Sequence, residues 1–214
     1  MNVRSDDRRD MEFVATTTQQ LETLAQHDAR LRPYFAGVFA SDALPSSPSK
    51  AHPRGYIVNV DRREEQGSHW LGVWTEDETC EIMDSFGMNV TRYDIPWFEK
   101  WTRDHFWAVR ESRKTLQAID SQSCGMYALA FLIVRATGIS MDGFLSMFTT
   151  HDYVKNDHRI AQWFKKTVKD TLVWERMKRE QPALFQGNTV PVRLLDMRAM
   201  WRSLSEEECG DTVF

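Results

Sequence analysis

The spacing of apolar residues predicts a helix near the N-terminus. Residues 11–31 place Phe13, Leu21 and Leu24 at helical spacing, which is typical of an amphipathic helix packed on a core. Pro33 is expected to stop this helix, because a proline has no backbone N–H to donate within it.

A loop and three strands are predicted next. Residues 41–54 are rich in Ser and Pro and indicate a surface loop. Strand-like apolar runs then follow at Tyr56–Val60, His69–Trp74 and Cys80–Asp84. Because the short polar sequence TEDET joins the second run to the third, these two strands are expected to form a hairpin.

Two helices are predicted in the middle of the chain. Residues Pro96–Trp107 are aromatic and favour a helix. Residues Cys124–Thr137 are apolar almost all round, which is typical of a helix buried in a core. Ser121 or Ser123 is available as its N-terminal cap, and Gly138 as its stop.

The C-terminal part adds further helices, predicted over residues 157–179 and 192–207. The order of helix, strands, buried helix and helices predicts an α+β fold, with a mostly antiparallel central sheet packed by helices. The helix that begins at Cys124 would be its buried central helix. With 214 residues and 42% hydrophobic content, the chain is expected to form a single domain over residues 1–214.

Charge is distributed unevenly. The whole chain carries −4, but residues 155–179 hold eight Lys or Arg against three Asp or Glu, a local +5 that leaves −9 for the remainder. Lys165, Lys166 and Lys169 on this segment are therefore candidate contacts for nucleic-acid phosphates. The alternative is an ordinary solvated helix face.

The cysteine content indicates a reducing compartment. Cys80, Cys124 and Cys209 are few and odd in number, so they do not form a disulfide framework, and none has zinc-ligand spacing. No role for Cys80 or Cys209 follows from the sequence. Residues 1–13 are charged and do not resemble a secretory signal, and the apolar run at 126–134 is too short to cross a bilayer. We expect an intracellular protein that does not enter a membrane.

Cys124 is the first candidate for chemistry. It lies at the predicted first turn of the buried helix, where unpaired N–H groups and the helix dipole favour a thiolate. Gly125 follows, so the backbone there can approach a substrate carbonyl closely. The alternative is a structural cysteine that behaves as a small buried apolar residue.

His69 and Asp84 are candidates for a base and for the acid that orients it. They lie at opposite ends of the predicted hairpin, so the start of one strand comes beside the end of the next. A carboxylate in that position can accept the imidazole N–H. Taken singly, each has a structural alternative: a strand histidine at a sheet edge and a turn aspartate.

Gln117 is a candidate for stabilising an oxyanion. It stands seven residues before Cys124, and a side-chain amide in such a role is typically worth ~3 kcal/mol of barrier. Gln122 is a nearer competitor. The alternative for Gln117 is a solvated loop residue.

Five motifs together resemble the adenovirus protease family in order and spacing. The resemblance covers about residues 33–135, continues faintly through residues 174–185, and leaves a helical C-terminal part at 140–208. The motifs are PYFAGVF (33–39), YIVN (56–59), GSHW (67–70), IMDSFG (82–87) and QAIDSQSCG (117–125).

The resemblance implies a cysteine protease in which Cys124, His69 and Asp84 form the triad and Gln117 contributes to the oxyanion hole. Trp70 would narrow the cleft and favour Gly just before the scissile bond. The implied reaction is acyl transfer through a thioester, with no metal or required cofactor. The implied role is cleavage of capsid and core precursors during virion maturation, in the host nucleus and the virion. We expect a monomer.

Three departures from the family pattern bear on activation. The acid is Asp84, where the adenovirus enzyme has Glu. No cysteine lies between Cys80 and Cys124, the region where the adenovirus enzyme links an activating peptide by a disulfide. The adenovirus enzyme is also basic and uses DNA as a cofactor, whereas this chain is acidic. The second and third departures count against a disulfide-linked peptide and against DNA, which are kept only as candidate activators.

Other functions are compatible with the same motifs. A deconjugase of ubiquitin-like proteins uses the same chemistry, although its Gln usually stands six residues before the Cys. A non-catalytic binding or scaffold protein of the same fold is a second alternative. The presence of all four catalytic residue types, Cys, His, Asp and Gln, argues against it, because a site that has lost activity usually lacks one of them. An acyltransferase with the same triad is a third, and no feature of the sequence favours it.

Overall fold

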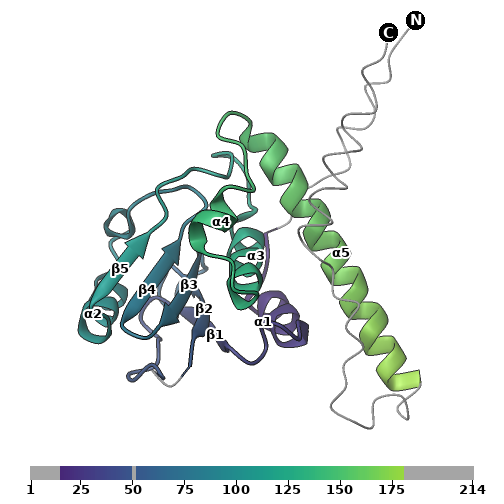
Figure 1. The fold of residues 1–214 in the computed structure, drawn as a ribbon, viewed down its shortest axis with the longest axis horizontal. Helices are drawn as coiled ribbons and strands as arrows, with labels where there is room; N and C mark the ends of the chain where they lie inside the picture. The colour runs from purple at the N-terminus through teal and green to yellow at the C-terminus, as the bar shows by residue number, and fades with distance from the viewer. Residues whose placement is uncertain (1–14, 50–51, 181–214) are drawn as a thin grey trace, which may run out of the picture.

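A five-stranded mixed sheet organises the described part of the chain (Figure 1). The structure is a computed structural model that describes residues 15–49 and 52–180, with side chains up to residue 169. The strands follow one another across the sheet in chain order. They are β1 (Phe35–Ala40), β2 (Arg54–Asn59), β3 (Trp70–Glu76), β4 (Thr79–Met83) and β5 (Ala108–Glu111).

The α+β class is confirmed, but the prediction of a mostly antiparallel sheet is wrong. β3 pairs antiparallel with both β2 and β4, whereas the outer pairs β1–β2 and β4–β5 are parallel. Parallel neighbours need a crossover connection. Here the loop after β1 and the helical segment after β4 supply the two crossovers, so each outer strand returns in the same direction as its neighbour.

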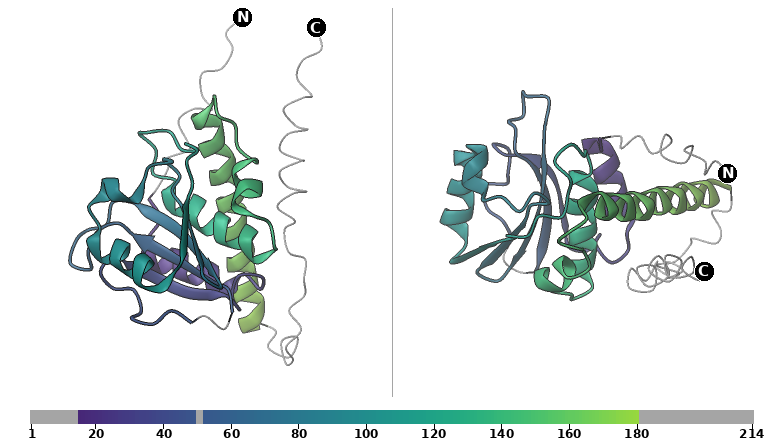
Figure 2. Two further views of the ribbon diagram at one scale, coloured as in Figure 1. Left: turned by 60° about the vertical axis from the view of Figure 1, so that its left-hand side comes forward. Right: turned by 90° about the horizontal axis from the view of Figure 1, so that it is seen from above.

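Helices cover both faces of the sheet (Figure 2). One face packs on α1, α3, α4 and the start of α5, and the other packs on α2. The alternation of side chains in β2 shows the division, because Ile57 joins the α3 side while Tyr56 and Val58 join the α2 side. The helices are α1 (Thr18–His27), the 3₁₀ turn η1 (Val90–Tyr93), α2 (Pro96–His105), α3 (Cys124–Ala136), α4 (Met141–Leu145) and α5 (Tyr153–Glu180).

The central helix α3 is buried from Cys124 through Val134, as its apolar pattern predicts. It lies close to β3 because Gly72 has no side chain, and a Cβ there would come within 2.9 Å of the Phe131 ring. Gly138, with φ +82°, ends the helix as predicted. Ser123 occupies the N-cap position, but its side chain makes no capping hydrogen bond.

Most of the predicted elements are confirmed within a few residues, including the hairpin and the helix after Pro96. The first helix is shorter than predicted, since it ends at His27. β1 and β5 were not predicted. Residues 11–14 of the first predicted helix, the helix predicted over 192–207 and Cys209 lie outside the described residues. In the described ranges, no helix is both long and apolar enough to traverse a lipid bilayer.

Candidate active site

The β3–β4 hairpin brings His69 and Asp84 together. His69 directly precedes β3 and Asp84 directly follows β4, so antiparallel pairing places them side by side. His69 Nε2 lies 2.8 Å from Asp84 Oδ1, and the two residues are only 5% and 1% exposed. The His69 carbonyl also accepts the Val60 N–H from the residue after β2, which fixes the backbone at this point. The predicted pairing of the two side chains is therefore present.

Four donors converge on the Asp84 carboxylate. Oδ1 accepts from His69 and from the Phe86 N–H at 2.9 Å, while Oδ2 accepts from the Met88 N–H at 2.9 Å and the Tyr93 hydroxyl at 2.8 Å. Burial alone would raise the pKa of Asp84, but the bond to His69 and the other donors outweigh it and lower the pKa. The carboxylate is thus held charged and in one orientation.

Two aromatic rings stack with the His69 imidazole. The ring centroids lie 4.9 Å apart for Phe86 and 5.3 Å apart for Tyr93. Tyr93 therefore acts twice, since its ring contacts His69 while its hydroxyl bonds Asp84. This stacking limits rotation of the imidazole, as a base acting on a fixed target requires.

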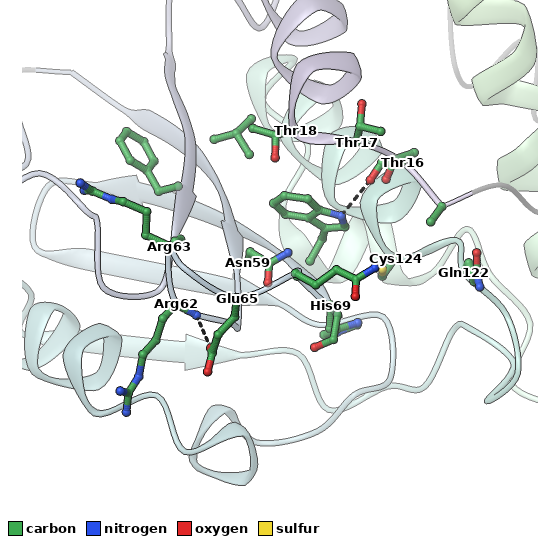
Figure 3. A pocket seen from close by; sticks show the side chains of 18 of the residues that line it. Thr16, Thr17, Thr18, Asn59, Arg62, Arg63, Glu65, His69, Gln122 and Cys124 are labelled. Atoms are coloured by element: carbon green, nitrogen blue, oxygen red, sulfur yellow. Dashed lines mark hydrogen bonds between the residues drawn. The ribbon is translucent and has the colours of Figure 1, made fainter.

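Cys124 is the first residue of α3 and completes the cluster. It is 7% exposed, and its thiol lies close enough to the His69 imidazole to raise the pKa of that ring. Because Asp84 occupies Nε2, the ring nitrogen facing the sulfur is Nδ1. The Cys–His contact lies in the pocket shown in Figure 3. Three separate stretches of chain thus bring the thiol, the imidazole and the carboxylate together.

The electrostatics of the cluster favour a protonated imidazole. Burial is the largest influence on His69 and lowers its pKa, but the bonds to Asp84 and Cys124 outweigh burial and raise the pKa to about 9. Cys80 provides a contrast, because burial and the nearby charge of Glu81 raise the pKa of its thiol.

The raised pKa of His69 predicts an alkaline limit on both stability and turnover. The contribution of the imidazolium to stability is complete below the unfolded value of 6.5 and is lost as pH rises through about 9. For the peptide hydrolysis that the family resemblance implies, the rate should fall over the upper part of this window, because the imidazolium then no longer protonates a leaving amine. Thermal unfolding and kcat/KM measured from about pH 6 to 10 would test both effects.

The same pH series has an internal control. Alkylation of Cys124 by iodoacetamide needs no proton donor, so its rate should not fall between about pH 8 and 10 while the protein stays folded. A hydrolysis profile that already declines near about pH 7 would contradict a raised His69 pKa.

Gln117 is buried rather than solvated, with 1% of its surface exposed. Its Oε1 accepts from the Ser85 hydroxyl at 2.6 Å, and its Nε2 donates to the Ser121 carbonyl at 2.7 Å. It also lines the pocket, together with Cys124. The amide group is thereby fixed in the wall of the cleft that also holds the thiol. Gln122 lines the same pocket at its rim (Figure 3).

The pocket is a cleft of about 720 Å³ beside the cluster. Its walls come from the segment before α1, from β1 and from the loop that leads to His69. Trp70 is half-buried in one wall, and its indole N–H donates to the Thr16 carbonyl at 3.3 Å. Thr16 and Trp70 also pack over Gly125, so Gly125, predicted to face the substrate, is buried beneath this wall and does not line the cleft.

Replacing Gly125 with Ala is expected to destabilise the protein by about 1–3 kcal/mol. A Cβ there would overlap Thr16 Oγ1 and come within 3.0 Å of the Trp70 ring. Thermal unfolding would measure the loss. Adding Thr16→Ala removes the overlapping hydroxyl and should recover part of it. A Gly125→Ala variant as stable as the unaltered chain would show that Thr16 moves aside freely.

Three contributors to the site were not predicted from the sequence: Ser85, Phe86 and Tyr93. Ser85 and Phe86 follow the candidate acid directly, so their adjacency was a usable signal. Tyr93 reaches the site from η1, and nothing in the sequence indicates it.

Other predicted residues lie apart from the cluster. Lys165, Lys166 and Lys169 belong to α5 and do not line the cleft. Over the part of the chain that the structure describes, no three His, Cys, Asp or Glu side chains are grouped to hold a metal ion.

Comparison with known proteins gives matches to adenovirus proteases. The protease of human adenovirus A serotype 12 is 30% identical over 129 residues, which is 54% of this chain and 62% of the relative. The protease of bovine adenovirus B serotype 3 is 28% identical over 145 residues, which is 61% and 71% of the two chains. These matches confirm the resemblance drawn from the motifs. The first match spans less than two thirds of its relative's length.

Solved structures give only distant likenesses. A crystal structure of an ASFV protease has a TM-score of 0.44 at 15% identity, over 67% of this chain and 66% of that one. The structure of ChlaDub1 from Chlamydia trachomatis has a TM-score of 0.40 at 13% identity, over 75% and 80%. No family model matches the chain.

Proposed function

We propose, from the geometry of the site and the sequence relationship to adenovirus proteases, that this chain is a cysteine endopeptidase. The observation that carries the proposal is the convergence of Cys124, His69 and Asp84 at one cleft. A cysteine that only fills space in the core has no need of a buried imidazole beside its sulfur. A histidine that only serves the fold has no need of a carboxylate that three other donors hold in one orientation. The combination suits a nucleophile, a base and the group that orients the base.

In the proposed reaction, the proton of the Cys124 thiol is held on His69 Nδ1 as an imidazolium, and the Cys124 Sγ thiolate attacks the peptide carbonyl carbon. The π electrons of the carbonyl move to its oxygen, which becomes an oxyanion. When this intermediate collapses, the C–N bond breaks, His69 returns the proton to the leaving amine, and a thioester remains. Water then attacks the thioester with His69 as base, releasing the acid and restoring the thiol. Asp84 stays ionised and stabilises the imidazolium.

The oxyanion would be stabilised from two directions. Gln117 has a second amide hydrogen that Ser121 does not use, and the backbone N–H at the start of α3 lies beside the sulfur. Donors fixed before the reaction need no rearrangement when the charge develops, and each is typically worth ~3 kcal/mol of barrier.

A preference for Gly just before the scissile bond is proposed from the resemblance to the adenovirus proteases. Trp70, the residue expected to restrict the cleft, lies in the cleft wall, and its indole N–H is held by the Thr16 carbonyl. Because the relatives are adenovirus proteases, we propose a viral protein. From the resemblance of the motifs we further propose that it cleaves capsid and core precursors during virion maturation, in the host nucleus and the virion. The proposed catalytic unit is a single monomeric domain that requires no metal. Activation by DNA, through Lys165, Lys166 and Lys169, or by a peptide stays a prediction.

A labelling and cleavage experiment tests the function. Iodoacetamide should modify Cys124 at least about 100-fold faster than the buried Cys80, because only Cys124 has an adjacent base. A panel of peptides with Gly before the cleavage site, tested beside ubiquitin-like fusions, would separate an endopeptidase from a deconjugase. Equal labelling of the two thiols and no cleavage in either panel would leave only a binding or scaffold protein of this fold.

A further inference from the structure

We infer that Ser85 is a positioning residue for catalysis, which fixes the side-chain amide of Gln117 in the orientation that an oxyanion requires. The inference rests on the proposed function. Ser85 is 0% exposed, and its hydroxyl donates to Gln117 Oε1 at 2.6 Å. It makes no contact with the reacting atoms itself, so its influence passes through the amide.

The two partners of the amide together select one of its two orientations. The Ser121 carbonyl can only accept, so the atom 2.7 Å from it must be the nitrogen of Gln117. The oxygen is then turned toward Ser85, whose hydroxyl can donate to it. One amide hydrogen is used by Ser121, and the second remains for the cleft that Gln117 lines. Without Ser85, a buried amide oxygen would lose its donor, and rotation of the amide would relieve that loss.

The backbone around Gln117 is held independently of the Ser85 hydroxyl. The Ser85 carbonyl accepts the N–H groups of Leu116 and Gln117, at 2.8 and 3.1 Å. From α5, Asn156 donates to the Leu116 carbonyl, and Asp157 accepts the Ala118 N–H at 3.0 Å. Removing only the hydroxyl should therefore leave the loop in place and free the amide alone.

The sequence Asp84-Ser85 thus serves both halves of the site. Asp84 orients the imidazole that moves the proton, and Ser85 orients the amide that would meet the oxyanion. A shift of this dipeptide would disturb both groups together. Ser112 holds the dipeptide in place, because its hydroxyl bonds the Asp84 N–H and carbonyl at 2.9 and 3.0 Å.

Ser85→Ala should impair peptide hydrolysis and aldehyde binding, which both need an oxyanion donor, and should spare alkylation of the thiol, which does not. We expect kcat for a Gly-containing peptide to fall about 10- to 100-fold, with KM within about twofold, because removing an oxyanion donor outright costs about 10²–10³. Affinity for a peptide aldehyde, which forms an oxyanion-like hemithioacetal with Cys124, should fall in parallel. The rate of iodoacetamide alkylation, a direct displacement at carbon with no oxyanion, should stay within about twofold.

A double-mutant cycle with Gln117→Ala supplies the decisive comparison. If Ser85 acts through the amide, Ser85→Ala should cost nothing further once Gln117 is replaced by alanine. Thr102→Val is the matched control, because it removes a buried hydroxyl on α2, on the other face of the sheet, and should lower stability without changing kcat. Ser85→Thr keeps a hydroxyl and should retain most of kcat.

The outcomes are distinct. If the unaltered chain is active but Ser85→Ala keeps the same kcat, the proposed role of Ser85 is wrong and the proposed function stands. The same holds if Ser85→Ala lowers kcat by the same factor whether or not Gln117 has been replaced by alanine. If the unaltered chain neither cleaves peptide nor binds the aldehyde, the proposed function falls and this inference falls with it. Should the alanine variant not fold, Ser85→Cys keeps the side-chain size but donates only weakly, and the same losses in kcat and aldehyde affinity are expected.

Discussion

Replacing Cys124 with Ala should abolish peptide hydrolysis, with a fall in kcat of about 10⁵- to 10⁶-fold. The sulfur is the atom that forms the thioester, and no other nucleophile among the described residues shares its contact with His69. Cys124→Ser should lose nearly as much, because a hydroxyl is a far weaker nucleophile than a thiolate beside the same imidazole. Both variants should fold, since the change is a single atom in a side chain at the edge of the cleft.

Cys80→Ala is the matched control for this prediction. Cys80 is fully buried in β4, on the α2 side of the sheet, and does not line the cleft. Its replacement should lower the free energy of unfolding through lost packing but leave kcat within about threefold. Hydrolysis that survives in Cys124→Ala, at a rate above about 1% of the unaltered chain, would exclude Cys124 as the nucleophile.

The part of the site that sequence predicted best is the part built by local pairing. A short polar turn between two apolar runs determines an antiparallel hairpin, and its register brings His69 and Asp84 together from 15 residues apart. The apolar pattern after Cys124 likewise determined a buried helix and therefore the place of the thiol at its first turn. In both cases the information lies within one short segment.

What the sequence did not reveal depends on contacts between distant segments. β5 is exposed along most of its length, so it lacks the alternation that marks a strand, and its parallel pairing with β4 depends on a crossover. Gln117 was open to interpretation as a solvated residue because its burial depends on Ser85, 32 residues away, and on α5 beyond it. Tyr93 reaches His69 and Asp84 only because η1 folds back over the hairpin.

Asp84→Asn should lower kcat about 10⁴-fold and also destabilise the protein, for a reason visible in the hydrogen bonds. All four partners of the carboxylate are donors, two on each oxygen. An asparagine has only one acceptor atom, so its NH₂ group must face one pair of these donors. If it faces the Met88 N–H and the Tyr93 hydroxyl, buried donors oppose each other, at a cost of about 1–3 kcal/mol.

If the NH₂ group of the substituted side chain instead faces His69, the loss is chemical. Nε2 must then accept, which places the ring proton on Nδ1, so the imidazole can no longer take the proton from Cys124. Either orientation impairs the site, and thermal unfolding with kcat would show how the loss divides between stability and chemistry.

Asp28→Asn is the matched control for Asp84→Asn. Asp28 is a buried carboxylate with backbone donors outside the cleft, so its replacement should affect stability alone. An Asp84→Asn variant that keeps more than about 10% of kcat would contradict the role of the carboxylate in orienting the base. The stacking of Phe86 and Tyr93 with His69 would then be enough to hold the imidazole, and the four hydrogen bonds of Asp84 would contribute to stability alone.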